Sequence, residues 1–293
     1  MSLNLPGLPA SHAGAKAVAV SGSLSSLINP NLKSRLDGAV AVIIPALNEA
    51  DALPGVLRRM PISCNELPVH ALVVDDGSGD TTGEVARAHG ALVARHERNR
   101  GGGAALRTGF ELAIDAGARI VVTLDADGQH APEEMENLVK PVLEGYADLA
   151  VGSRALGAAA PNAFARELGI AVFNKLITFL MRHKITDCSN GYRAIRTGML
   201  AQLDLRQEQF HTSELLIEAL ARGAQVIEVP VHIAPRTHGT SKKPRSFRYG
   251  FGFARAIFVT WLRTLRHRGG RPSPRSARTR PVPERSAHEP GDA

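Results

Sequence analysis

The chain has 293 residues, of which 44% are hydrophobic, so it is long enough for one large domain or two small domains with a substantial core. Its two cysteines are too few for a disulfide framework or a cysteine-based metal cluster. No apolar stretch reaches the roughly 20 residues that span a bilayer, and the N-terminus lacks the long apolar core of a signal peptide. We therefore expect neither secretion nor insertion across a membrane.

The formal net charge of +7 is unevenly distributed along the chain. Residues 236–293 contain 14 Lys and Arg against 3 Asp and Glu, whereas residues 1–235 contain 21 against 25. The body is therefore mildly acidic and the C-terminal part strongly basic. A basic segment attracts phosphate groups, whether they belong to nucleic acid, to lipid head groups or to a substrate.

The first part of the chain predicts an α/β domain. Residues 1–36 are rich in Ser, Ala, Gly and Asn and predict a flexible N-terminal segment. Apolar runs that predict buried strands then alternate with segments that predict helices ending near residues 59, 89, 116 and 144. The expected strands are at 39–44, 69–74, 91–94, 120–124 and 148–152. This alternation is typical of a doubly wound, parallel sheet with right-handed crossovers.

After Arg154 the regular alternation ends. We expect a long helix at 163–181, a polar turn at 187–193 that enters a short strand, a further helix, a strand at 225–229 and a loop at 236–246. Glu214 and Glu218 lie one turn apart on the further helix, and we interpret them as part of a solvated face.

Three acidic turns, at residues 45–49, 75–80 and 125–129, follow strands of the predicted sheet. Ligands of such sheets bind outside the carboxyl ends of the strands, where these turns would gather. Their like charges repel, and a bound cation would relieve the repulsion. Asp125 and Asp127 would point the same way along an extended chain, and their oxygens suit Mg²⁺ or Mn²⁺. Taken alone, an Asp-x-Asp pair is better explained as a polar turn with a helix cap.

Five sequence blocks, taken together and in order, resemble family 2 glycosyltransferases with the GT-A fold, particularly dolichol- or polyprenol-phosphate mannose and glucose synthases. The blocks are VIIPALNE at 42–49, VVDDGS at 73–78 followed by Asp80 and Thr81, LDADGQH at 124–130, DCSNGYR at 187–193 and RTHGTSK at 236–242. They cover roughly residues 39–245. The resemblance implies a single GT-A domain with a Rossmann-like nucleotide-binding half and an acceptor half.

The resemblance also implies roles for the matching positions. The nucleotide of the donor would be bound by Pro45, Leu47, Glu49, Val74, Asp76, Asp125, Ala126, Arg236 and Lys242. The divalent metal, Mg²⁺ or Mn²⁺, would be held by Asp125, Asp127 and Gln129. Catalysis would rest on Asp127, Arg236 and Lys242, the last two from a mobile loop that closes over the donor. The acceptor phosphate would be met by Arg154, Arg166 and Ser241, although Arg166 could equally face solvent.

The implied reaction transfers a hexose, with inversion, from a donor of the GDP-mannose or UDP-glucose type to a polyprenyl or dolichyl phosphate. The metal, Arg236 and Lys242 would stabilise the charge that develops on the departing nucleoside diphosphate. A phosphate acceptor is already anionic at pH 7 and needs no base. A hydroxyl acceptor on a soluble sugar, polysaccharide or metabolite is the alternative, with Asp187 or Glu214 as its base. A non-enzymatic nucleotide- or nucleic-acid-binding protein is a third interpretation.

The C-terminal part predicts a separate helix. Between residues 247 and 268, apolar residues recur at helical spacing, with arginines mostly to another side; they are Phe247, Phe251, Ala254, Phe258, Trp261 and Leu265. This helix would either pack on the body or lie on anionic lipid at the cytoplasmic face of a membrane, as a peripheral contact. We therefore divide the chain into a flexible segment (1–36), a GT-A domain (37–246), this amphipathic helix (247–268) and a disordered basic tail (269–293).

Overall fold

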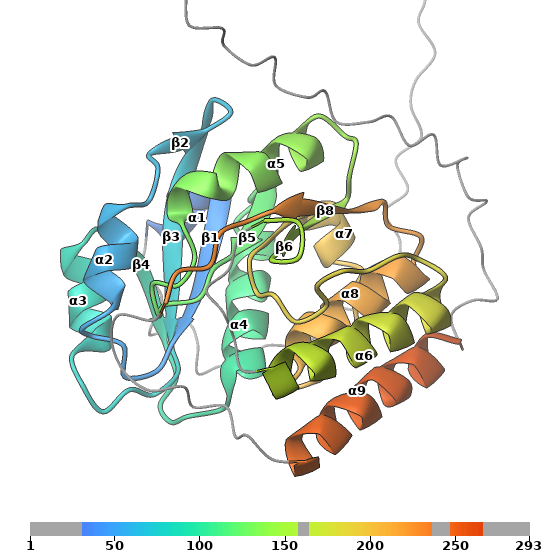
Figure 1. The fold of residues 1–293 in the computed structure, drawn as a ribbon. Helices are drawn as coiled ribbons and strands as arrows, with labels where there is room; N and C mark the ends of the chain where they lie inside the picture. Colours follow the sequence, from blue (N-terminus) through green and yellow to red (C-terminus); the bar gives the residue numbers. More distant parts are fainter. Residues whose placement is uncertain (1–30, 158–163, 236–246, 266–293) are drawn as a thin grey trace, which may run out of the picture.

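The computed structural model of the chain describes residues 31–157, 164–235 and 247–265 (Figure 1). Its strands are β1 (Val40–Ala46), β2 (Ser63–Cys64), β3 (Leu67–Asp75), β4 (Leu92–Arg95), β5 (Ile120–Thr123), β6 (Leu149–Ser153), β7 (Arg193–Arg196) and β8 (Val226–Pro230). Its helices are α1 (Leu32–Leu36), α2 (Leu53–Arg58), α3 (Thr82–Ala88), α4 (Gly102–Asp115), η1 (Pro132–Glu134), α5 (Met135–Leu143), α6 (Phe164–Met181), α7 (Thr197–Leu200), α8 (His211–Ala221) and α9 (Phe247–Leu265).

The strands form one mixed sheet in the order β2-β3-β1-β5-β7-β6-β8, with β4 also paired to β3. The pairs β1–β3, β1–β5, β3–β4 and β6–β8 are parallel, which confirms the predicted α/β class and mostly parallel sheet. β7 was expected only as a short strand, and it inserts antiparallel between β5 and β6. Because β7 runs in the opposite direction, the turn at 187–192 that precedes it lies at the carboxyl edge of β5.

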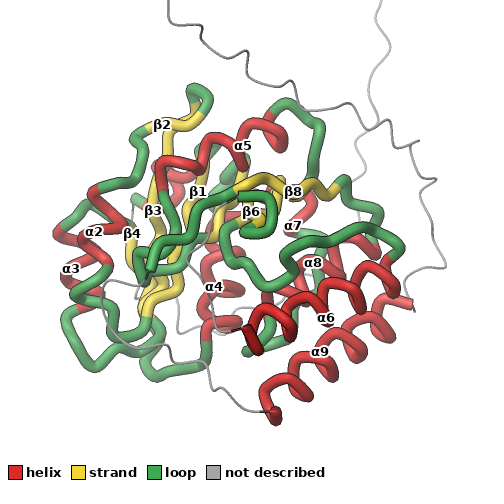
Figure 2. Tube along the Cα trace, in the orientation of Figure 1, coloured by secondary structure: helices red, strands yellow, loops and turns green. Residues whose placement is uncertain are grey.

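Helices cover both faces of the sheet, as Figure 2 shows. The continuous apolar run of β1 explains this arrangement, since alternate residues point to opposite faces. Ala41 and Ile43 join the core formed with α1, α4, α6, α8 and α9, whereas Val40, Val42 and Ile44 join the core formed with α2, α3 and α5. The sheet is therefore the middle of three layers.

The N-terminal boundary of the domain lies earlier than the sequence predicted. Residues 1–36 were expected to be flexible, but Leu32 and Leu36 of α1 are buried in the core beside α4. Two further short elements, β2 and α7, were not predicted. They have 2 and 4 residues, too few to produce a readable periodicity.

Helix α9 belongs to the same core as the rest of the domain. Phe253 and Ile257 are buried against α6 and α8. The apolar stripe, for which packing on the body and contact with lipid were both open, is only partly covered: Phe251, Phe258 and Leu265 are exposed, whereas Trp261 packs against the core. Among the described residues, no helix combines the length and the apolar character needed to cross a membrane.

Candidate functional site

The first two acidic turns are tied to each other at the carboxyl edge of the sheet. Asn48 takes a positive φ of 51°, its backbone N–H donates to Ser78 Oγ at 3.0 Å, and its side-chain oxygen accepts from the Gly79 N–H at 2.8 Å. The N–H of Glu49 donates to Thr82 Oγ1 at 2.9 Å. These contacts hold the chain out of helical geometry, so α2 begins at Leu53 instead of at Asn48. Leu47 and Glu49 are half-buried on this turn.

Asp76 holds neighbouring loops in place through hydrogen bonds. Its carboxylate accepts hydrogen bonds from the backbone N–H groups of Arg100 (2.9 Å) and Gly101 (2.8 Å), and it lies 2.6 Å from His96 Nδ1. His96 Nε2 is in turn 2.9 Å from Thr108 Oγ1 on α4. Asp76 is buried, so this network ties β3 to α4. His96 was missed, since a lone histidine 20 residues after Asp76 carries no motif.

Asp75 is also buried, and within the described part of the structure only one of its two oxygens is hydrogen-bonded. Its Oδ1 accepts from the Ser78 N–H at 2.8 Å, and its Oδ2 lies 3.4 Å from Nε of Arg95. The expectation that the three acidic turns need a cation to relieve their repulsion is therefore wrong for Asp75 and Asp76. Backbone N–H groups, Arg95 and His96 relieve it there.

Two residues expected at the nucleotide pocket have their side chains in the core. Val74 is completely buried against α4, and Ala126 is buried against α2 and α5. Their side chains cannot reach a ligand at the edge, so any contact they make must come from the backbone. Their place in the nucleotide site therefore stays a prediction, now limited to backbone contacts.

Asp125 and Asp127 follow β5 and differ in exposure. The Asp125 side chain is 46% exposed and lies against Gly191, where a Cβ would come within 3.1 Å of Asp125 Oδ1. Asp127 is buried, and its Oδ1 accepts the Gln129 N–H at 3.1 Å. Thr123, at the end of β5, donates to the Gly191 carbonyl and fastens the turn before β7 to this strand. Asp125 is thus the carboxylate presented at the open edge.

Two polar side chains lie near Asp125, and a divalent cation held there by Asp125, Asp127 and Gln129 stays a prediction. His130 is buried, and its Nε2 lies 2.9 Å from Asn190 Oδ1. Its Nδ1 lies 4.0 Å from Asp125 Oδ2 and has no hydrogen-bond partner among the described residues. The Gln129 amide nitrogen donates to the Ala234 carbonyl at 3.2 Å, which leaves the amide oxygen as a candidate ligand. No group of three His, Cys, Asp or Glu in the described ranges is arranged to hold a metal. Phosphate oxygens and water would have to complete the coordination, as is usual for Mg²⁺ at a substrate.

A pocket adjoins Asp125 between the sheet, α4 and α8. Its walls combine apolar and polar side chains from β1, α4, α8, the loop before α8 and the neighbouring ends of β5 and β7; the lining residues are Pro45, Gly103, Leu106, Arg107, Phe110, Thr123, Leu124, Asp125, Gly191, Arg193, Leu205, Gln207, His211, Thr212 and Leu215. Of the predicted site residues, the structure brings Pro45 and Asp125 together here. The polar residues from α4 and α8 were missed, because they belong to segments without a motif.

Arg193 is a buried arginine in the lining of this pocket. It donates to the backbone carbonyls of Cys188 (3.0 Å), Asn190 (2.9 Å) and Thr212. Burial lowers the pKa of its guanidinium to about 10. By binding these carbonyls, Arg193 fixes the turn before β7 to the start of α8 and so sets the wall of the pocket facing Asp125.

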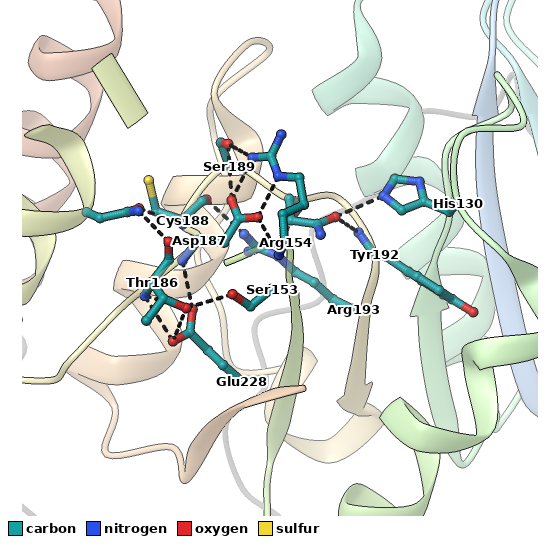
Figure 3. Close-up of polar contacts among 12 residues, drawn as sticks. His130, Ser153, Arg154, Thr186, Asp187, Cys188, Ser189, Tyr192, Arg193 and Glu228 are labelled. Atoms are coloured by element: carbon teal, nitrogen blue, oxygen red, sulfur yellow. Dashed lines mark hydrogen bonds and ion pairs between the residues drawn. The ribbon is translucent and has the colours of Figure 1, made fainter. Parts of the chain in front are cut away.

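Arg154 and Asp187 form a bidentate ion pair at the carboxyl edge of the sheet (Figure 3). Arg154 Nε and Nη2 lie 2.6 and 2.7 Å from the two carboxylate oxygens, and Nη2 also donates to Ser189 Oγ at 2.6 Å. Burial alone would raise the pKa of Asp187, but hydrogen bonds and charge from Arg154 outweigh it and hold that pKa below its ordinary value. In the structure Arg154 is paired with Asp187. The role of Arg154 at an acceptor phosphate stays a prediction.

The turn that carries Asp187 is held from two sides (Figure 3). Glu228 of β8 accepts from the N–H groups of Thr186 (2.9 Å) and Asp187 (2.8 Å). Asn174 of α6 donates to the Thr186 carbonyl and accepts the Cys188 N–H at 2.9 Å. The Arg154–Asp187 pair therefore rests on a turn fixed to both the sheet and α6.

Glu214 and Glu218, expected on a solvated face, are buried. Arg263 of α9 lies 2.8 Å from Glu214 and 2.9 Å from Glu218, and Arg222 pairs with Glu218. Glu214 also accepts the N–H groups of Arg206 (3.0 Å) and Gln207 (2.8 Å). The expectation was wrong because α9, which covers these carboxylates, comes much later in the chain.

Several predicted residues lie outside the described part of the structure. Arg236, Ser241 and Lys242 fall in the range 236–246, and the side chain of Arg166 is also not described. The described chain reaches this range beside Gln129, where the N–H of Ala234 donates to the Gln129 carbonyl at 2.8 Å.

Comparisons with known proteins show what the chain is similar to. The profile described as glycosyl transferase family 2 matches residues 41–204. The polyprenol monophosphomannose synthase of Mycolicibacterium smegmatis is 38% identical over 216 residues, covering 69% of this chain and 79% of that protein. The UDP-N-acetylglucosamine–dolichyl-phosphate N-acetylglucosaminyltransferase of Methanococcus voltae is 31% identical over 224 residues, covering 67% and 85%.

A solved structure shows the same fold. The glucosyl-3-phosphoglycerate synthase of Mycobacterium tuberculosis, crystallised with Mn²⁺, UDP and glucosyl-3-phosphoglycerate, superposes with a TM-score of 0.59. Its sequence is 22% identical, and the match covers 80% of this chain and 82% of that one. At this identity the likeness establishes the fold and leaves the substrates open.

Proposed function

Because the chain belongs to glycosyl transferase family 2, we propose that it transfers a hexose from a nucleotide-diphosphate sugar to a polyprenyl phosphate. The position of Asp125 at the open carboxyl edge, with a small pocket beside it, supports this proposal. The relatives named above act on polyprenol or dolichyl phosphate, which supports the acceptor class. One uses mannose and the other N-acetylglucosamine, so the donor is left open between GDP and UDP sugars.

The observation that carries the acceptor assignment concerns two carboxylates. A hydroxyl acceptor needs a base, and the sequence suggested Asp187 or Glu214. Asp187 is held by Arg154, with its pKa lowered, and Glu214 is buried beside Arg263. The lowered pKa makes Asp187 a poor proton acceptor, and the carboxylate of Glu214 is buried and already engaged by Arg263 and by backbone N–H groups. A phosphate monoester is already anionic at neutral pH and attacks without proton removal. The arrangement therefore favours a phosphate acceptor over a soluble hydroxyl acceptor.

The donor diphosphate would lie between the strand edge and the loop that follows Pro235. Asp125, Asp127 and Gln129 would hold Mg²⁺ or Mn²⁺, which supplies charge stabilisation to the leaving diphosphate when bound. Arg236 and Lys242 would add positive charge beside the leaving diphosphate, and Asp127 would help to hold the metal in place. Pro45, Leu47 and Glu49 would support the nucleotide from the turn after β1. Asp76 would contribute by shaping the loop at Arg100 and Gly101.

The acceptor phosphate would approach from the side of β6 and α6. Arg154 would exchange part of its contact with Asp187 for the phosphate, and Arg166 and Ser241 would add further contacts. A lipid-linked acceptor places the protein at a membrane surface, and we assign it to the cytoplasmic face as a peripheral protein. No role in binding nucleic acid follows from this arrangement.

The test is a transfer assay with the purified full chain. Labelled GDP-mannose, UDP-glucose and UDP-N-acetylglucosamine are each offered with polyprenyl phosphate and Mn²⁺ or Mg²⁺, and lipid-extractable label is measured. We expect label from one donor, loss of transfer with EDTA, and recovery when the metal is restored. No lipid product with any donor, or equal transfer to a soluble sugar acceptor, would overturn the proposal.

A further inference from the structure

Helices α6 and α9 expose large apolar side chains that no other described element covers. Figure 1 shows the two helices side by side on the outer layer, and they pack against each other through Phe173 and Phe253, with ring centroids 4.4 Å apart. Phe179 of α6 is 79% exposed and Phe251 of α9 is 74% exposed. Soluble domains rarely leave several large apolar side chains exposed on two neighbouring helices unless the surface binds something.

The exposed side of α9 is not needed to hold the helix in place. Ile257, Thr260 and Thr264 are buried on its opposite side, and Phe258 and Leu262 point outward. The helix is therefore apolar on two sides, one of which packs on α6 and α8. The outward apolar side stays exposed in the folded domain, whereas a core helix would have both of its apolar sides covered.

Charge on this surface is of one sign. Lys175 of α6, Arg182 just after it and Arg255 of α9 are exposed. Neither α9 nor residues 169–181 of α6 contain an acidic residue. Aromatic and aliphatic side chains flanked by basic residues are typical of helices that lie in the interface of an anionic bilayer.

We propose that α6 and α9 together form a docking surface for an anionic lipid bilayer, here called the α6–α9 surface and defined by Val172, Phe179, Phe251, Phe258, Leu262 and the basic residues Lys175, Arg182 and Arg255. The apolar side chains enter the head-group region, and the basic residues meet lipid phosphates. A second copy of the chain is a poorer occupant, since a two-fold contact through this surface would bring like charges together.

The surface is joined directly to the acceptor side of the site. Asn174, on the inner side of α6, holds the turn at Thr186 and Cys188, and this turn carries the partner of Arg154. A bilayer held against the exposed side of α6 would therefore be separated from the turn that carries Asp187 by this one helix. The purpose of the surface rests on the proposed function, whereas lipid binding itself does not depend on transfer activity.

The test compares vesicle binding of the full chain and a triple variant. Phe179→Glu, Phe251→Glu and Phe258→Glu are combined, and binding to vesicles of phosphatidylcholine with or without phosphatidylglycerol is measured by co-sedimentation. We expect the wild type to prefer the anionic vesicles and the triple variant to bind them at least about tenfold more weakly. Both proteins keep residues 266–293, so any attraction of that basic segment is common to both.

The matched control is Ile62→Glu, which places a charge on an apolar residue that is 91% exposed. Ile62 directly precedes β2, and Figure 1 shows β2 far from α6 and α9. This variant should bind vesicles as the wild type does. Circular dichroism and the thermal midpoint establish that the triple variant is folded. If a folded triple variant binds like the wild type, or if the wild type ignores anionic vesicles, the proposal fails. A dimer of the wild type without lipid, dissolved by the triple variant, would assign the surface to a second copy instead.

A short-chain, water-soluble polyprenyl phosphate separates this proposal from the proposed function. The triple variant should transfer sugar to this acceptor within about twofold of the wild-type rate, because no residue of the site is changed, and should lose activity on vesicle-embedded acceptor. Absence of transfer by the wild type to the short acceptor would count against the proposed function alone, with vesicle binding intact.

Discussion

Arg263 places its Nη2 atom 2.8 Å from Oε1 of Glu214 and so joins the last helix of the domain to a carboxylate 49 residues earlier. The same nitrogen donates to the Asp204 carbonyl at 2.6 Å. Glu214 in turn holds the N–H of Gln207, whose carbonyl accepts Arg107 Nη1 at 2.9 Å in the lining of the pocket. Helix α9 is therefore connected through hydrogen bonds to the pocket beside Asp125.

Replacing Arg263 by methionine should strongly destabilise the fold. The change leaves Glu214 without its cation and Glu218 with Arg222 alone, and both carboxylates are buried. Removal of one partner of a buried ion pair costs about 3–5 kcal/mol. Urea denaturation followed by circular dichroism measures the loss. The matched control, Arg255→Met on the exposed side of α9, should change stability by no more than about 0.5 kcal/mol. Equal effects of the two variants would mean that the buried network contributes little.

Replacing Gly191 by alanine should impair transfer without unfolding the protein. The new Cβ would come 3.1 Å from Oδ1 and 3.3 Å from Oδ2 of Asp125, so the carboxylate would have to move aside. Misplacement of a catalytic group by a fraction of an ångström to 1 Å lowers kcat by roughly 10- to 100-fold. Steady-state transfer rates and the thermal midpoint check this. Gly198→Ala on α7, where nothing lies within 4 Å of the added Cβ, should leave both unchanged. An unimpaired Gly191→Ala enzyme would show that Asp125 does not need its observed position.

The Arg154–Asp187 pair should make stability fall in acid. Because the pKa of Asp187 is lowered in the folded protein, its stabilising contribution is complete above the unfolded value of about 3.9 and is lost as the pH falls through the lower folded value. Asp187→Asn should therefore be less stable than the wild type at pH 7, by about 3–5 kcal/mol, since Arg154 is left without its counter-charge.

The comparison between the wild type and Asp187→Asn isolates the contribution of the Asp187 carboxylate to the pH dependence of stability. Urea denaturation at a series of pH values should show the difference between wild type and Asp187→Asn shrinking below about pH 4. A difference that stays constant into strong acid would contradict the assignment of the lowered pKa to Asp187.

Both cysteines should be unreactive in the folded protein. Burial raises the pKa of the Cys64 thiol to about 11 and that of the Cys188 thiol to about 12, so neither forms appreciable thiolate at pH 8. An aromatic disulfide reagent should titrate no thiol in buffer and two in urea, since the chain has two cysteines. Prompt reaction without denaturant would mean that one of the two sites opens readily.

Much of the fold could be predicted from local patterns. The apolar runs that form β1, β3 and β5 could be recognised because a strand buried on both faces is a continuous run of apolar residues. The turn with Asp125 and Asp127 was located for a related reason, since carboxylates after such a run must leave the core. The order of β7 in the sheet was not predictable in this way, because pairing between β5 and β7 depends on residues about 70 positions apart.

The sequence by itself determined the α/β class, the strand edge that carries Asp125 and the glycosyltransferase resemblance, because periodicity and turn chemistry act over a few neighbouring residues. Only the tertiary structure decided that Glu214 is buried and that Phe251 faces outward. A helix with apolar residues on two sides does not reveal which side the body will cover, and a carboxylate does not reveal the arginine that a later helix will bring. Those outcomes depend on packing between α8 and α9, which meet only once the chain has folded.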